Sequence, residues 1–159
     1  MAMPVLARES FLAIAGELSS LAIAHFEEVD GGVEPRRRLA LDLATLSKMD
    51  QLGAMRVYTA RAGEAKTLVG YCTWNVEFDV ESYGLLIARQ GAWYVSPKAP
   101  GAGLRLFKFA LADLKRAGVK CTFPHHRLQG RGTEARLGAW FRRLGAKPIQ
   151  LDYSLWIGD

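Results

Sequence analysis

The spacing of the apolar residues changes along the chain, and this change limits the possible folds more than any other sequence feature. In residues 8–29 the apolar side chains recur every three or four positions, at Phe11, Ile14, Leu18, Leu21 and Ala22. Such a stripe predicts an amphipathic helix. Residues 55–60 and 67–78 are instead rich in Val, Tyr, Thr and Trp, which predicts two strands joined by a turn. A chain with both periods predicts a mixed α/β or α+β fold and excludes all-helical and all-strand folds.

The same patterns predict the remaining elements. A second helix is expected over residues 35–52, because Pro35 suits a first helical turn. Further along the chain the expected elements are a strand at 85–95, a helix at 102–116 ended by Gly118, a strand at 119–123, a helix at 133–144 and a last strand or strand pair at 149–157. Helices at the start, strands in the middle and strand–helix alternation at the end fit one domain spanning residues 1–159.

Composition excludes several classes of protein. Apolar residues make up 50% of the chain and charged residues 23%, which argues against disorder and against a disulfide-dependent scaffold. Apolar runs are too short for a membrane span, and the first residues lack the pattern of a secretory signal. Cys72 and Cys121 lie in apolar runs without CxxC spacing, so we expect two buried thiols in a cytoplasmic protein. With only three His in the chain, no metal site is expected.

The net charge of +5 favours an anionic partner without identifying it. Nucleic acid, an acidic protein surface and a polyphosphate cofactor all qualify, and a solvated basic surface is an equal alternative. The basic runs at residues 36–38 and 142–143 are not interleaved with aromatic residues, as nucleic-acid modules often are. We therefore expect no nucleic-acid binding at physiological salt.

The segment from Trp93 to Leu104 carries the clearest chemical signal. It places an apolar strand, a Pro-containing turn and a Gly-x-Gly directly before an amphipathic helix. The first amides of a helix have no intrahelical partner, and the helix dipole favours negative charge there. Gly101 and Gly103 would let a phosphate approach those amides, and Lys98 adds positive charge. The pattern has no third glycine and no Gly-Lys-Ser/Thr, so it is neither a dinucleotide fingerprint nor a P-loop.

The segment Lys98-Ala99-Pro100-Gly101-Ala102-Gly103 resembles the central motif of the GNAT superfamily of acyl-CoA-dependent N-acyltransferases, a strand followed by Arg/Gln-x-x-Gly-x-Gly/Ala and a helix. The order of elements also resembles that family over residues 40–157, and the similarity looks greatest to acetyltransferase-like proteins of phages and prophages. The resemblance implies a mostly antiparallel twisted sheet, flanked by helices, with a splayed parallel strand pair. It also implies a cytoplasmic location in a bacterial or phage-infected cell, as a monomer or homodimer without a membrane partner.

The activity implied by the resemblance is transfer of an acetyl group from acetyl-CoA to a primary amine, on a small molecule or on a protein Lys or N-terminus. The amides of residues 101–104 would bind the pyrophosphate, the backbone of residues 93–95 would pair with the pantetheine, and a splay between that strand and residues 119–123 would admit the thioester. The implied cofactor-binding residues are Trp93, Tyr94, Val95, Lys98, Gly101, Ala102, Gly103, Leu104 and Arg105.

Three positions depart from the family pattern. Lys98 replaces the first Arg or Gln of the motif. Gly91 stands where many members carry a carboxylate general base, and Phe141 stands where many carry a Tyr that protonates the leaving thiolate. These departures keep open an alternative from another class, a catalytically silent protein of this fold that binds CoA or a protein partner.

Other residues are therefore candidates for proton transfer. His125 follows the expected strand at 119–123, near the side where the acceptor should enter, and a base near pH 7 would neutralise the attacking amine. A surface or supporting role for His125 remains the alternative. Tyr153, on the last expected strand, is the candidate acid, with a packed aromatic as its alternative. Glu77, Asp79 and Glu81 are expected in a loop that could attract a cationic acceptor.

Overall fold

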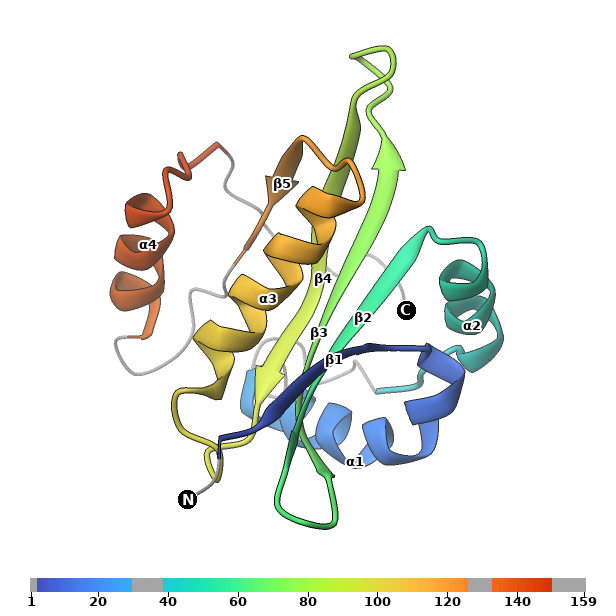
Figure 1. The fold of residues 1–159 in the computed structure, drawn as a ribbon, viewed down its shortest axis with the longest axis vertical. Coiled ribbons are helices and arrows are strands. Elements are labelled where there is room, and N and C mark those ends of the chain that lie inside the picture. The colour runs from blue at the N-terminus through green and yellow to red at the C-terminus, as the bar shows by residue number, and fades with distance from the viewer. Residues whose placement is uncertain (1–2, 30–38, 126–132, 150–159) are drawn as a thin grey trace, which may run out of the picture.

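The computed structural model describes residues 3–29, 39–125 and 133–149. Its elements, in chain order, are β1 (Val5–Glu9), α1 (Phe11–Val29), α2 (Leu43–Gln51), β2 (Met55–Ala62), β3 (Thr67–Phe78), β4 (Leu86–Val95), α3 (Ala102–Arg116), β5 (Cys121–Phe123) and α4 (Thr133–Arg143). In the described part of the chain the strands form one sheet in the order β1-β2-β3-β4-β5 (Figure 1). Neighbours from β1 to β4 are antiparallel and β4–β5 is parallel, which confirms the predicted mixed fold.

Helices cover both faces of this sheet, because its strands alternate apolar side chains between two hydrophobic clusters. One cluster joins the sheet to α3 and α4 and includes Tyr58, Cys72, Trp74, Ala88, Leu106, Phe107 and Phe141. The other joins the sheet to α1 and α2 and includes Phe11, Ile14, Leu18, Met55, Val57, Leu68 and Tyr71. The protein is thus a sheet between two helical layers, with α3 packed against β2, β3 and β4 (Figure 1).

A β-bulge in β4 reverses the facing of its side chains. Cys72 pairs with Trp93 but Trp74 pairs with Gln90, so Gly91 and Ala92 together oppose Thr73. The Ala92 amide donates to Thr73 Oγ1 at 2.8 Å. Before the bulge Ala88 packs in the α3–α4 cluster; after it Trp93 and Val95 pack there, while Ala92 and Tyr94 pack on the α1–α2 side.

The structure corrects three expectations near the ends of elements. Residues 5–9 form β1, an edge strand paired with β2, where the sequence predicted no strand and placed residues 8 and 9 in a helix. Helix α2 begins at Leu43, because Asp42 caps it by accepting the Thr45 amide at 3.0 Å. Residues 39–42 are not helical, and the rest of the predicted helix start lies outside the described residues.

The prediction that both cysteines are buried is confirmed for Cys72 and wrong for Cys121. Cys72 is fully buried, and burial raises the pKa of its thiol to about 12. Cys121 is exposed, because β5 lies at the edge of the sheet over the described residues. Across residues 3–29, 39–125 and 133–149, no helix is both long and apolar enough to cross a membrane.

Candidate active site

The loop between β4 and α3 forms the centre of the candidate site. Within it the Ala99 amide donates to the Ser96 carbonyl at 2.9 Å and the Lys98 amide donates to Ser96 Oγ at 3.3 Å. Gly101 then adopts a left-handed conformation (φ 78°) as the N-cap of α3. Glycine suits this position because a side chain would strain the left-handed backbone. Helix α3 therefore begins directly after this loop, at Ala102.

Among the described residues, no side chain caps the start of α3. The amide of Ala102 donates to the Ala99 carbonyl at 3.2 Å, so it is already used inside the protein. Because the first helical amides lack intrahelical acceptors, the amides of Gly103 and Leu104 are those best placed to meet an anion. Within residues 101–104 the structure uses the Ala102 amide internally, and binding of an anion by the other amides stays a prediction.

The two glycines of the loop are there for different reasons. A Cβ atom on Gly101 would meet nothing within 4 Å, so only its backbone conformation calls for glycine. A Cβ atom on Gly103 would make ordinary contacts with Trp93 at 3.6 Å and Val95 at 3.7 Å, and Gly103 needs no left-handed backbone. Internal packing therefore does not require glycine at 103. Its small size leaves space beside the first amides of α3, which suits an approaching phosphate.

Positive charge surrounds this helix start. Lys98, Arg105 and Lys108 are all exposed within or directly after the loop. Leu104 between them is also 41% exposed. Together with the positive end of the α3 dipole, these side chains favour an anion such as a pyrophosphate.

The Trp93 side chain packs in a cluster of aromatic rings next to the loop. Its ring centroid lies 4.7 Å from Phe107, 6.1 Å from Trp140 and 6.5 Å from Phe141. Phe141 is only 7% exposed and packs in the core between the sheet and α4. The position where a leaving-group acid is customary thus holds a packed aromatic ring.

Gly91 lies in the β4 bulge, and there the structure explains the missing carboxylate. A Cβ atom on Gly91 would lie 2.6 Å from Thr73 Oγ1, which is too close for any real contact. That same oxygen accepts the Ala92 amide and so holds the bulge. A glutamate at position 91 would have to displace Thr73 and loosen the bulge.

The β4–β5 pairing covers only the first part of β4. It runs from Ile87↔Cys121 to Arg89↔Phe123, whereas β4 continues to Val95. Next along β4, Gln90 is 8% exposed and its Oε1 accepts the His125 amide at 3.3 Å. His125 is exposed and follows β5, as expected, and Gln90 holds its backbone against β4. Sequence reasoning missed Gln90, whose signal is an uncharged polar residue two positions after Ala88, on the same face of β4.

Tyr94 turns its side chain to the opposite face of the sheet from Trp93. Its ring stacks on His25 of α1 with centroids 5.0 Å apart, and His25 Nδ1 lies 2.8 Å from Tyr71 Oη. Burial raises the pKa of Tyr71 and of Tyr94, and the Glu28 carboxylate raises that of Tyr94 further. A ligand that contacts the Trp93 side chain can therefore reach only the backbone of Tyr94. The contact between Tyr94 and His25 was not predicted from the sequence.

The predicted acidic residues that the structure describes, Glu77, Asp79 and Glu81, lie away from this loop. Glu77 lies within β3 and pairs with Arg89 at 2.9 Å, not in the loop where it was expected. Asp79 accepts the Glu81 amide in the turn between β3 and β4, at the far end of the hairpin from the loop. Tyr153 and residues 36–38 lie outside the described residues.

Comparison with known proteins gives one short sequence match. No family model matches the chain. Endonuclease MutS2 of Pediococcus pentosaceus is 31% identical over a match of 91 residues that covers 52% of this chain and 12% of that protein. The chain thus spans about an eighth of the length of the curated relative it matches, and the match leaves the family open.

Solved structures match along almost the whole chain. Ribosomal-protein-alanine N-acetyltransferase from Brucella melitensis superposes with a TM-score of 0.74 at 16% identity, over 99% of this chain and 100% of that one. An aminoglycoside acetyltransferase from an uncultured soil metagenomic sample gives 0.69 at 16% identity, over 98% and 97%. Glucosamine-6-phosphate N-acetyltransferase from Arabidopsis thaliana gives 0.68 at 6% identity, over 99% and 100%. At such identities the likeness shows the fold alone, and the chain has the fold of the GNAT acetyltransferases.

Proposed function

We propose that this protein is an acetyl-CoA-dependent N-acetyltransferase that acts on a primary amine. The observation that carries the proposal is the junction of β4 and α3. There a left-handed Gly101 leads into a helix start that no side chain of the described segments caps, beside exposed basic residues. The GNAT fold and the acetyltransferases that share it support the same function.

In this proposal the pyrophosphate of acetyl-CoA binds the amides of Gly103 and Leu104, with Lys98 and Arg105 facing its charge. The pantetheine pairs with β4 beyond Arg89, where the described pairing with β5 ends. Glycine at 103 suits this ligand, because a side chain there would add bulk beside Trp93 and Val95, at the start of α3.

The reaction is direct attack of the neutral amine on the thioester carbonyl. The N–C bond forms, the C–S bond breaks, the amine loses a proton and CoA leaves as a thiolate that takes one up. The developing oxyanion accepts a hydrogen bond from the backbone amide of one residue in the segment 91–95 of β4, which stabilises its charge. The Ala92 amide is excluded from this role, because it donates to Thr73 Oγ1.

Positioning supplies most of the rate acceleration in this proposal, since Gly91 and Phe141 cannot transfer protons. His125 is the proposed base, acting directly or through water, with its backbone held by Gln90. Tyr153 is the proposed acid. The acceptor is an amine of a small molecule or a protein, and the amines named by the structural neighbours are the first probes.

A second function has its own supporting observation. The bulge leaves no room for a carboxylate at Gly91, and Phe141 is buried in the core. A protein of this fold that binds CoA or a protein partner without turnover would show this same pair of features.

One experiment separates the two functions. Acetyl-CoA would be incubated with a ribosomal-protein N-terminal peptide, an aminoglycoside and glucosamine 6-phosphate, and loss of thioester absorbance would be followed. Absorbance is preferable to a thiol-reactive dye, because Cys121 is exposed and would react with the dye. Calorimetry with CoA would be run in parallel.

Acceptor-dependent loss of thioester supports the enzyme. Binding of CoA without turnover on any amine supports the silent protein. Absence of CoA binding at millimolar ligand overturns both CoA-dependent functions. Lys98→Ala should weaken CoA only a few-fold, because an exposed charge pair contributes under about 1 kcal/mol.

A further inference from the structure

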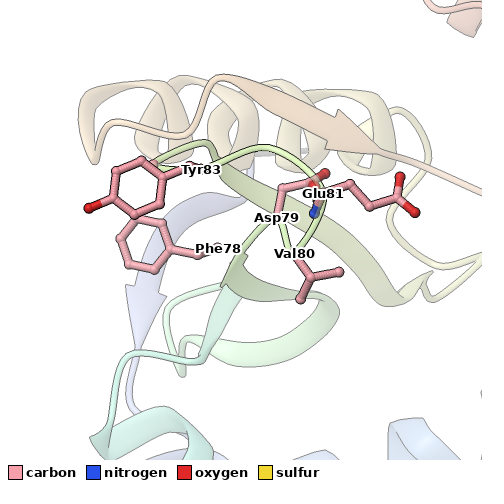
Figure 2. A pocket seen from close by; sticks show the side chains of 6 residues that line it. Phe78, Asp79, Val80, Glu81 and Tyr83 are labelled. Carbon is pink, nitrogen blue, oxygen red and sulfur yellow. Dashed lines mark hydrogen bonds between the residues drawn. The ribbon is translucent and has the colours of Figure 1, made fainter.

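The turn between β3 and β4 carries an exposed apolar surface far from the candidate active site. Phe78 is 67% exposed, Val80 is 99% exposed and Tyr83 is fully exposed. This turn, residues 78–84, is here called the tip; it projects beyond the rest of the sheet (Figure 1) and forms an open hollow of about 490 Å³. In Figure 2 the labelled side chains of Phe78 and Tyr83 are drawn on one side of the turn, and those of Val80 and Glu81 on the other. Large apolar side chains that project into water are typical of an interaction surface.

The tip is also acidic, although the chain as a whole carries a net charge of +5. Asp79 and Glu81 both belong to it, and Glu81 is exposed. An apolar surface with carboxylates selects a partner that is apolar at its centre and basic at its rim.

The same chain presents such a surface beside the tip. Leu111, Lys115, Val119, Lys120 and Thr122 line a hollow of about 390 Å³ between α3 and β5. Leu111 and Val119 provide its apolar part, and the two exposed lysines provide its positive charge. The Lys120 amide donates to the Leu86 carbonyl at 2.9 Å, which fixes this α3–β5 hollow beside the last residue pair before the tip.

We propose that the tip docks into the α3–β5 hollow of a second copy of this chain, in a two-fold symmetric exchange. The tip and the hollow differ in charge sign and lie at the same end of the molecule. Two copies related by a two-fold axis can therefore fill both hollows with both tips, which closes the assembly as a dimer.

The contact area is sufficient for such a dimer. Each large aromatic side chain covers about 150–250 Å² when buried. Because Phe78 is 67% exposed, it can add only about two thirds of this area. Phe78 and Tyr83 from two tips, with the surfaces that receive them, then bring the total to about 1,000–1,700 Å², which overlaps the range of specific interfaces. A single tip in a single hollow would bury only half of this area. The reciprocal contact of two tips with two hollows is therefore needed for a stable dimer.

Charge reversal on each surface tests the exchange. The tip variant carries Asp79→Lys and Glu81→Lys, and the hollow variant carries Lys115→Glu and Lys120→Glu. Each variant alone places like charges in both contacts and should be monomeric. Mixed in equal amounts they should form a heterodimer, because each tip then meets a hollow of opposite charge. Sedimentation velocity from about 1 μM to 1 mM would measure the association, with one variant labelled in the mixture.

Glu64→Lys, in the exposed turn between β2 and β3 away from the tip, is the matched control and should dimerise like the wild type. Circular dichroism and the melting temperature would establish that each variant is folded. A wild type that stays monomeric up to about 1 mM overturns the proposal. So does a dimer that either charge-reversed variant retains, or a mixture of folded variants that fails to associate.

Discussion

Replacement of Gly101 by Asp should weaken CoA binding at least tenfold. A Cβ atom at this position meets no other atom within 4 Å, so the new side chain causes no clash. It places a carboxylate at the start of α3, where the pyrophosphate is proposed to bind. Two like charges about 4 Å apart repel by roughly 1 kcal/mol in water and roughly 4 kcal/mol near a protein surface. Each 1.4 kcal/mol is about tenfold in affinity, so these limits correspond to roughly fivefold in water and several hundredfold near a protein surface. Because the site lies at the protein surface, we expect a loss above tenfold.

Gly101→Asn is the matched control. Asn and Asp have nearly the same size, and both tolerate the left-handed backbone (φ 78°) better than other residues do. Any strain or bulk should therefore affect both variants alike, and the difference in affinity between them measures charge alone. Calorimetry with CoA at two salt concentrations is the assay, because screening should shrink that difference as salt rises. If folded Gly101→Asp and Gly101→Asn bind CoA equally well, the pyrophosphate does not lie at this helix start.

Three further predictions concern the bulge, the ion pair at the sheet edge and proton transfer. Gly91→Ala should lower the free energy of unfolding by about 1–3 kcal/mol, because its Cβ meets Thr73 Oγ1, and urea denaturation should show a smaller loss in a Thr73→Ala background. The hydrogen bond from Arg61 lowers the pKa of Glu9 below its ordinary 4.5, so this pair stabilises the fold above that pH and the stability is lost as pH falls through the lowered pKa. The melting temperature of the wild type should therefore fall further between pH 7 and about pH 3 than that of Arg61→Leu, and equal falls would contradict the assignment. His125→Ala should lower the acyl-transfer rate about tenfold to a hundredfold with little change in CoA affinity, and an unchanged rate between about pH 6 and 9 would remove it from the mechanism.

The sequence was sufficient where local pattern and tertiary environment agree. Helix α3 has the predicted ends, Ala102–Arg116, since glycines with positive φ stand just outside both of them. Strand β3 also has its predicted ends, because its β-rich run is bounded by turns. The β4–α3 loop could be singled out for the same reason, as its glycines and its helix are consecutive in the chain.

The sequence was insufficient where structure depends on distant partners. Strand β1 has five residues, and all its pairing is with β2, so no local signal identifies it. The β4 bulge arises from the fit of Gly91 and Ala92 against Thr73, and no spacing rule shows which face Trp93 takes after it. Contacts such as Gln90–His125 join residues 35 positions apart and become visible only when β4 and the end of β5 are placed together.

The pairing of β1 with β2 also bears on the order in which the protein assembles. Arg61 and Glu9 are 52 positions apart, so this pairing must close a loop that contains both α1 and α2. Strands β2, β3 and β4 follow one another through turns, and their pairing needs no such long closure. Because closure entropy grows with loop length and local contacts form faster, we expect the β2–β4 meander to form early and β1 to join it last. By the same reasoning β1 should open first, and its backbone amides should exchange with deuterium well before those of β3.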